Sequence, residues 1–155
     1  DNIKYGSNAL LPLLQLLYPN LNYSATVFHI DHIYPKSKFI KTTAGLPSNY
    51  IGRENELFNL QLLEGVVNEE KKAKDPEIWL KKQYPNTDKR EKYLEDNYIP
   101  KDFVLNWDNL PEFEKKRKPL LMEKLYGAFG IETKLLGQVG TQNETDENLS
   151  DIELL

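Results

Sequence analysis

The apolar positions of the chain recur mainly at helical spacing, and two short apolar runs have the composition of strands. Five segments have the periodicity and the start or stop signals of helices, and they span residues 7–18, 67–74, 76–84, 88–96 and 110–129. Residues 25–33 are rich in β-branched and aromatic side chains and predict a strand. Residues 57–63 predict a second strand or an irregular hairpin arm. The pattern therefore predicts a mainly α fold with a small β-hairpin, of the α+β class.

Polar and proline residues predict where several helices begin. Ser7 or Asn8 is expected to cap the first helix. Asp75 followed by Pro76 is a strong start signal, because an aspartate cap and a proline at the first helical position both suit a helix N-terminus. Pro119 lies inside the last helical segment, where it predicts either a kink or the start of a new helix.

The length and composition limit the class of protein. With 155 residues, of which 39% are hydrophobic and 28% charged, the chain is long enough for one folded domain with a core. Residues 141–155 carry five acidic and no basic side chains, so they account for the whole net charge of −4. They predict a disordered tail after a domain of residues 1–140. No apolar run approaches the roughly 20 residues that a membrane-spanning helix needs.

The chain has no cysteine, which excludes disulfides, cysteine-bound zinc, iron–sulfur clusters and thiol nucleophiles. Any metal ion must be held by histidine, carboxylate, amide or water ligands. Such ligands favour hard ions such as Mg²⁺ or Mn²⁺.

Four polar residues have the chemistry that phosphodiester hydrolysis requires. The reaction needs a divalent ion that stabilises the leaving 3′ oxygen, and Asp31 and the amide of Asn68 can supply oxygen ligands for it. It also needs a base that deprotonates a water in line with the scissile bond, and the imidazole of His32 has a suitable pKa. Asn59 can hold the intervening loop through hydrogen bonds from its side chain to the backbone.

Three ordered elements resemble the HNH (ββα-metal) nuclease motif, in its form with asparagine in the third position. They are Asp-His-Ile-x-Pro, Asn-Leu-x-Leu-Leu and Asn-x-x-Lys, and they lie within residues 28–72. The resemblance implies that Asp31 and Asn68 bind the metal ion. It also implies that His32 is the general base and that Asn59 is the structural asparagine of the catalytic motif. The loop between the halves lacks the Gly-Gly pair of many HNH proteins, which leaves its path undetermined.

A wider part of the chain resembles the C-terminal nuclease region of GmrSD-type restriction proteins. The resemblance rests on the apolar helix before the motif, the aromatic-His-Ile-Asp-His start, and the trailing segments IPKDF and LPEFEKKRKPLLMEKL. It implies cleavage of modified or foreign DNA within a restriction or phage-defence protein, and a ParB-like nucleotide-hydrolysing domain before this region. Because the chain begins with Asp1 and shows no signal peptide, we expect a fragment of a longer cytoplasmic protein of a bacterium or archaeon. One such site cuts one strand at a time, so a double-strand break needs a homodimer or two encounters.

Several neighbouring residues allow two interpretations. His29 shares a strand face with Asp31, so it is either an accessory metal ligand or phosphate contact, or a solvated or packed strand residue. Lys71 falls where the HNH family often has a basic residue near the phosphate, although a solvated helix face is the alternative. Lys36 and Lys38 follow the proposed base in a polar loop, where they either track DNA or are plain loop residues.

The alternative to a nuclease is an HNH-fold module that binds nucleic acid or a protein without cleaving. The presence of every motif residue weighs against this alternative. Metal-dependent nicking of plasmid DNA by the isolated domain, compared with His32→Ala, separates the two.

Overall fold

The computed structural model describes residues 3–131, which contain five α-helices and one two-stranded sheet. The elements are α1 (Leu10–Leu17), β1 (Phe28–His32), β2 (Leu60–Glu64), α2 (Gly65–Lys71), α3 (Pro76–Gln83), α4 (Thr87–Asp96) and α5 (Leu110–Ala128). This order confirms the predicted mainly α fold with a small β-hairpin. The predicted acidic tail, residues 141–155, and the last part of the predicted domain lie outside the described residues. Within residues 3–131, no helix combines the length and the hydropathy needed to cross a membrane.

The strands β1 and β2 form an antiparallel hairpin whose two faces differ in polarity. Asp31 pairs with Gln61, and His32 pairs with Leu60. Successive side chains leave a strand on opposite faces, so Asp31 and Gln61 share one face while His32 and Leu60 share the other. Strand β2 begins three residues later than predicted because residues Leu57–Asn59 form a short 3-10 helix, η3, before it.

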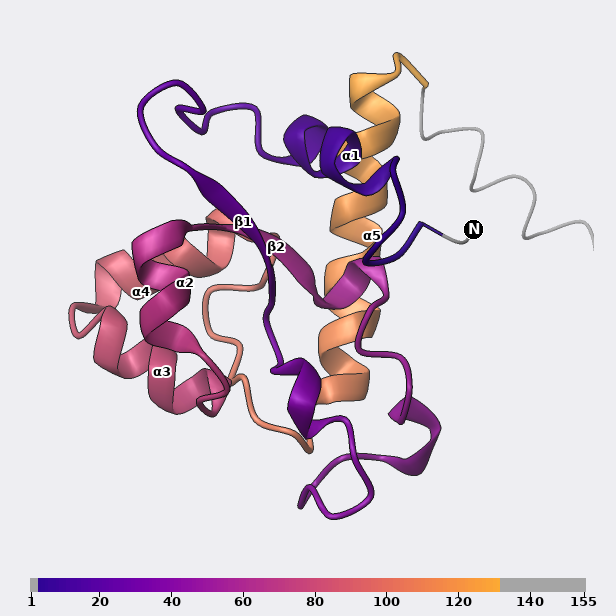
Figure 1. Cartoon of the computed structure of the whole chain (residues 1–155), viewed down its shortest axis with the longest axis vertical. Helices are drawn as coiled ribbons and strands as arrows, with labels where there is room; N and C mark the ends of the chain where they lie inside the picture. The colour runs from indigo at the N-terminus through magenta and orange to yellow at the C-terminus, as the bar shows by residue number, and fades with distance from the viewer. Residues whose placement is uncertain (1–2, 132–155) are drawn as a thin grey trace, which may run out of the picture.

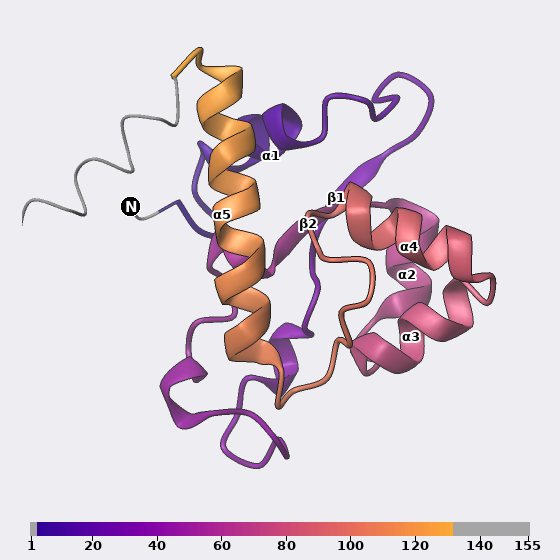
Figure 2. The same ribbon diagram turned by 180° about the vertical axis from the view of Figure 1, so that it is seen from behind.

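The hairpin lies between two groups of helices (Figures 1 and 2). Helices α1 and α5 lie on one side, and the buried side chains there are Leu10, Leu14, Leu17, Tyr18, Leu60, Leu62, Leu121 and Leu125. Helices α2, α3 and α4 lie on the other side, where Leu63 of β2 is buried with Trp79, Leu80, Tyr93 and Leu94. Both faces of the hairpin are therefore packed, which fixes the positions of its polar side chains.

The observed N-cap of α3 is the predicted one, whereas the observed N-cap of α1 differs from the prediction. The Asp75 side chain accepts a hydrogen bond from the backbone N–H of Ile78 at 3.1 Å, as expected of a cap. Helix α1 begins at Leu10, and its N-cap residue, Ala9, makes no side-chain cap bond. The predicted cap Ser7 lies outside the helix because its carbonyl accepts from the Leu10 N–H at 3.1 Å, which closes a separate turn.

Helix α5 continues through Pro119 as one helix, so the predicted start of a new helix there is wrong (Figure 2). Proline lacks the N–H that would bond the carbonyl of Lys115 one turn earlier. Pro119 and Lys115 both lie on the exposed side of α5, where water can bond the released carbonyl. The helix therefore tolerates a residue that would break it inside the core.

Among residues 3–131, Arg117 is the largest side chain that is completely buried, and it joins α5 to the middle of the fold. Its guanidinium donates to the carbonyls of Phe58 at 2.5 Å, Leu60 at 2.9 Å and Asn97 at 2.8 Å. It also donates to the hydroxyl of Tyr18 at 3.2 Å. Burial is the main cause that lowers the pKa of Arg117 and raises the pKa of Tyr18 to about 12. The guanidinium is therefore held by carbonyl dipoles and a neutral phenol.

Candidate functional site

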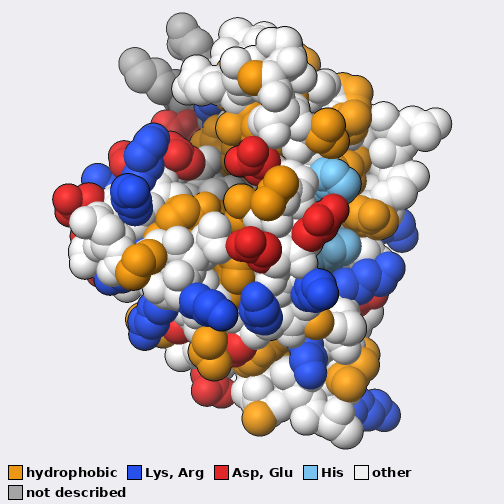
Figure 3. All heavy atoms as spheres, turned by 60° about the vertical axis from the view of Figure 1, so that its left-hand side comes forward, with side chains coloured by type: hydrophobic (Ala, Val, Ile, Leu, Met, Phe, Trp, Pro, Cys, Tyr) orange, Lys and Arg blue, Asp and Glu red, His pale blue; other side chains and the backbone are white. Residues whose placement is uncertain are grey.

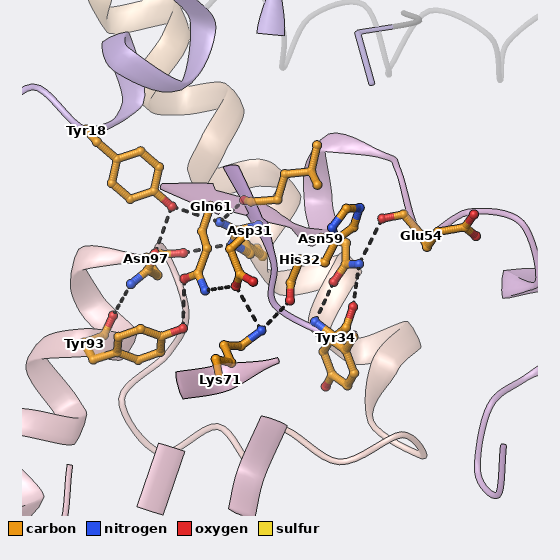
Figure 4. Close-up of polar contacts among 12 residues, drawn as sticks. Tyr18, Asp31, His32, Tyr34, Glu54, Asn59, Gln61, Lys71, Tyr93 and Asn97 are labelled. Atoms are coloured by element: carbon orange, nitrogen blue, oxygen red, sulfur yellow. Dashed lines mark hydrogen bonds and ion pairs between the residues drawn. The ribbon is translucent and has the colours of Figure 1, made fainter. Parts of the chain in front are cut away.

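The carboxylate of Asp31 lies between the hairpin and helix α2, in a buried position (Figure 4). Its Oδ2 atom accepts a hydrogen bond from Gln61 Nε2 at 2.7 Å. The same atom forms an ion pair with Lys71 Nζ at 2.9 Å. Among the residues that the structure describes, none donates a hydrogen bond to the other oxygen, Oδ1. One carboxylate oxygen is therefore held by the protein, and one is left for another ligand.

The amide of Gln61 is itself held by a buried tyrosine. Tyr93 of α4 donates to Gln61 Oε1 at 2.8 Å, and the Gln61 side chain is fully buried. Burial raises the pKa of Tyr93 well above its usual value, so the phenol stays a neutral donor. Because the Gln61 oxygen accepts from Tyr93, its nitrogen must face Asp31. This chain of hydrogen bonds fixes the rotation of the Asp31 carboxylate.

Lys71 is buried at the end of α2, with 1% of its side chain exposed. Besides Asp31, its ammonium contacts the carbonyl of His32 at 2.5 Å and lies 5.5 Å from the ring centre of Trp79. Burial lowers the pKa of Lys71, while the charge of Asp31 opposes that shift. Sequence reasoning offered a phosphate contact or a solvated helix face for this residue. The structure excludes the solvated helix face, because the ammonium is buried against Asp31 and points into the protein.

His32 ends strand β1 on the opposite face from Asp31, and its ring is half-buried. Its Nε2 atom lies 3.0 Å from Asn55 Oδ1, and its ring centre lies 5.0 Å from that of Tyr5. Since Asn55 Oδ1 can only accept, this contact assigns the proton to Nε2 and leaves Nδ1 with its lone pair. Burial lowers the pKa of His32, although the Asn55 bond and Asp31 act in the opposite direction. The imidazole is therefore neutral at neutral pH, as a general base must be.

Asn59 is fully buried directly before β2 and bonds three backbone groups. Its Oδ1 accepts from the N–H of Tyr34 at 2.8 Å. Its Nδ2 donates to the carbonyl of Tyr34 at 3.0 Å and to that of Glu54 at 2.9 Å. The side chain thus ties the segment after β1 to the segment before β2, so that both ends of the long loop are held beside the site.

Replacing Asn59 with alanine should lower the free energy of unfolding by about 2–4 kcal/mol, because three buried backbone groups lose their partner. Urea denaturation followed by circular dichroism measures the loss. Asn49→Ala, at an exposed position of the same loop, is the matched control and should change stability by less than about 0.5 kcal/mol. A loss at Asn59 as small as that of the control would contradict the anchoring role.

Helix α2 turns Asn68 toward the face of β1 that carries His29 and Asp31. Gly65 begins the helix, and a Cβ atom built on it would lie only 3.1 Å from His29 Nε2. Lys71, six residues later on the same helix, reaches Asp31. Asn68 lies midway between Gly65 and Lys71, about 60° around the helix from each, so it points between the directions of these two residues. The structure thus brings Asn68, His29 and Asp31 to one side of the hairpin.

The residues on this side fit a hard divalent ion. Asp31 Oδ1 and the Asn68 amide take no side-chain hydrogen bond from the described residues, so both oxygens remain as potential ligands. Within residues 3–131 there is no cluster of three His, Cys, Asp or Glu side chains that could hold a metal ion. A site of one carboxylate and one amide matches Mg²⁺ or Mn²⁺, since such ions usually keep several waters and bind substrate phosphates.

Basic side chains border the histidines on the surface. Figure 3 shows both histidines of the chain on one face, with a band of Lys and Arg side chains below them and Asp and Glu side chains beside them. Lys36 and Lys38 are exposed in the 3-10 helix η1 (Lys36–Lys38), just after the end of β1. The ammonium of Lys36 lies 5.7 Å from the ring centre of Tyr5, which in turn contacts His32.

Four residues that contact the site were not singled out by the sequence: Tyr5, Asn55, Gln61 and Tyr93. Gln61 had a usable signal, because it is the single polar residue in the apolar run LQLL of a buried strand. The others had none, since they come from segments before, between and after the motif elements.

Comparison with known protein families gives a match over most of the chain. The family model described as GmrSD restriction endonucleases, C-terminal domain, matches residues 3–123. The match includes the hairpin, α2 and every candidate site residue named above. No curated protein matches the chain significantly.

Proposed function

Because the chain belongs to the family of GmrSD restriction endonuclease C-terminal domains, we propose that it hydrolyses DNA phosphodiester bonds with a divalent metal ion in an HNH-type site. It would act as the nuclease part of a restriction or phage-defence protein. In the whole protein, a ParB-like nucleotide-hydrolysing domain would precede this region.

The observation that supports this proposal best is the pair of consecutive residues at the end of β1. Asp31 and His32 leave the strand on opposite faces, one with a free carboxylate oxygen and the other with a neutral imidazole. In-line hydrolysis needs the attacking water and the leaving oxygen on opposite sides of the phosphorus. A phosphate at the end of the strand would have the base on one side and the metal ligands on the other.

Each residue then has one task. His32 removes a proton from the attacking water through Nδ1, while Asn55 holds Nε2 and so keeps the ring in place. Asp31 Oδ1 and the Asn68 amide oxygen would hold Mg²⁺ or Mn²⁺. A bound ion there stabilises the negative charge that develops on the phosphate and the 3′ oxygen. The products would carry 5′-phosphate and 3′-hydroxyl ends.

The DNA backbone would approach across the exposed loop after β1. Lys36 and Lys38 are exposed there, and Lys36 lies close enough to His32 to contribute to its lowered pKa. Phosphate contacts of this kind position DNA without reading its sequence. His29, exposed beside Gly65, is an accessory residue that would contact the phosphate or the metal ion.

The whole chain should nick supercoiled plasmid DNA in Mg²⁺ or Mn²⁺, and excess EDTA should abolish the reaction, because the proposed ligands are hard oxygens.

Asn68→Ala should weaken Mn²⁺ binding at least tenfold in calorimetric titration while leaving the melting temperature nearly unchanged, since the amide makes no side-chain hydrogen bond within the described residues. Asn97→Ala is unsuitable as a control, because the buried Asn97 side chain accepts from the Tyr18 hydroxyl and donates to the Tyr93 carbonyl. Asn49→Ala, which is exposed, is the suitable one.

Two results would reject the proposal. Undiminished cleavage in excess chelator would exclude the metal mechanism. A folded chain that binds DNA but does not nick it with any divalent ion would instead support a silent binding module.

A further inference from the structure

We infer that Lys71 is a built-in countercation for Asp31, so that the catalytic metal ion binds tightly only together with a DNA phosphate. The inference rests on the proposed function, because it concerns how the proposed metal site is loaded.

The first step is that Asp31 is already neutralised inside the protein. Lys71 Nζ lies 2.9 Å from Asp31 Oδ2. Within residues 3–131, neither side chain forms an ion pair with any other residue. The ammonium is buried and cannot turn toward solvent without leaving Asp31 and the carbonyl of His32. Before any metal arrives, the carboxylate and the ammonium together carry no net charge.

The second step is that Lys71 would stay beside a bound ion. Gln61 and Lys71 both hold Oδ2, so a metal ion is left with Oδ1 of the same carboxylate. With a metal–oxygen distance of about 2.1 Å, the ion would lie on the order of 5 Å from the ammonium. Like charges at that separation repel strongly even when the effective dielectric constant is about 20. The ammonium therefore opposes metal binding by the free protein.

The third step is that the proposed ligands other than Asp31 supply no negative charge to offset this repulsion. Asn68 is a neutral ligand, and no group of three His, Cys, Asp or Glu side chains surrounds the site in residues 3–131. A DNA phosphate supplies both an oxygen ligand and the missing negative charge. Metal and DNA should thus favour each other's binding, and this coupling must be reciprocal.

The test is a titration with Mn²⁺, with the free ion measured by electron paramagnetic resonance. The protein carries His32→Ala so that the DNA stays intact. Three forms of it are compared: Lys71 unchanged, Lys71→Gln, and Lys72→Gln. Lys72 is the exposed neighbour, and its substitution removes the same charge from solvent. Each form is titrated with and without a short duplex at fixed ionic strength, and Mn²⁺ bound by the duplex alone is subtracted.

With Lys71 unchanged, the duplex should tighten Mn²⁺ binding at least tenfold. Without DNA, Lys71→Gln should bind Mn²⁺ at least tenfold more tightly than the form with Lys71, because the ammonium is gone while an amide donor remains. Lys72→Gln should behave like the form with Lys71. Thermal melts check that each variant is folded.

Two outcomes overturn the inference: Lys71→Gln binding Mn²⁺ no more tightly without DNA, or the form with Lys71 binding equally well with and without DNA. The second outcome decides the matter even if Lys71→Gln does not fold. The variant Asp31→Asn separates a failure of the inference about Lys71 from a failure of the proposed metal site. If Asp31→Asn abolishes Mn²⁺ binding, the metal site stands and only the role of Lys71 is rejected. If Mn²⁺ binding does not depend on Asp31, the proposed site itself is rejected, and the inference with it.

Discussion

His32→Ala should reduce DNA cleavage by about 10²–10⁴-fold, the usual cost of removing a general base, while the fold, metal binding and DNA binding remain nearly intact. The imidazole lies on the opposite face of β1 from Asp31, so its loss removes no proposed metal ligand. Its contacts are one hydrogen bond to Asn55 and the ring of Tyr5, both at the edge of the core, so the variant should still fold.

Single-turnover cleavage of a labelled duplex, Mn²⁺ calorimetry and a thermal melt measure these effects. His29→Ala is the matched control, because it removes the other histidine of the same strand and should cost far less activity. If metal affinity falls with activity in His32→Ala, His32 is a ligand rather than the base. If the variant melts early and its folded fraction still cleaves, the role of His32 is structural.

Arg117→Met should be the most destabilising single substitution considered, with a loss of roughly 3–5 kcal/mol and a fall in melting temperature of roughly 10–20 °C. The substitution keeps much of the side-chain volume. However, the carbonyls of Phe58, Leu60 and Asn97 lose their shared donor in a position without access to water. Each unpaired buried group costs about 1–3 kcal/mol. The total is a large part of the stability of a domain of this size.

Urea and thermal denaturation of the folded protein test this expectation. Lys115→Met, two residues earlier on the exposed side of α5, removes the same charge and should change stability by less than about 0.5 kcal/mol. Arg117→Lys should also be destabilised, since one ammonium cannot reproduce the planar fork of donors. A melting temperature of Arg117→Met within a few degrees of the wild type would show that the hydrogen bonds of Arg117 contribute little to stability.

The sequence by itself determined the local structure and the order of the site residues. Helical periodicity, the Asp75-Pro76 start and the β-branched run before Pro35 are local signals, because each depends on residues only a few positions apart. The alternation of strand side chains also predicted that His29 and Asp31 share a face. The family resemblance read from the motif elements agrees with the match over residues 3–123.

Only the tertiary structure decided which polar side chains lie inside. Lys71 and Lys72 are neighbours of the same type, yet the first is buried against Asp31 and the second is exposed. Arg117 lies in a run of four basic residues, and it alone of the four is fully buried. Neighbouring positions on α5 point about 100° apart, and Lys72 leaves α2 at its C-cap with a φ of 48°. Which basic side chain faces inward therefore depends on the direction from which β1, η3 and β2 pack against α2 and α5. That direction is set by contacts between segments far apart in the chain, and no local pattern contains it.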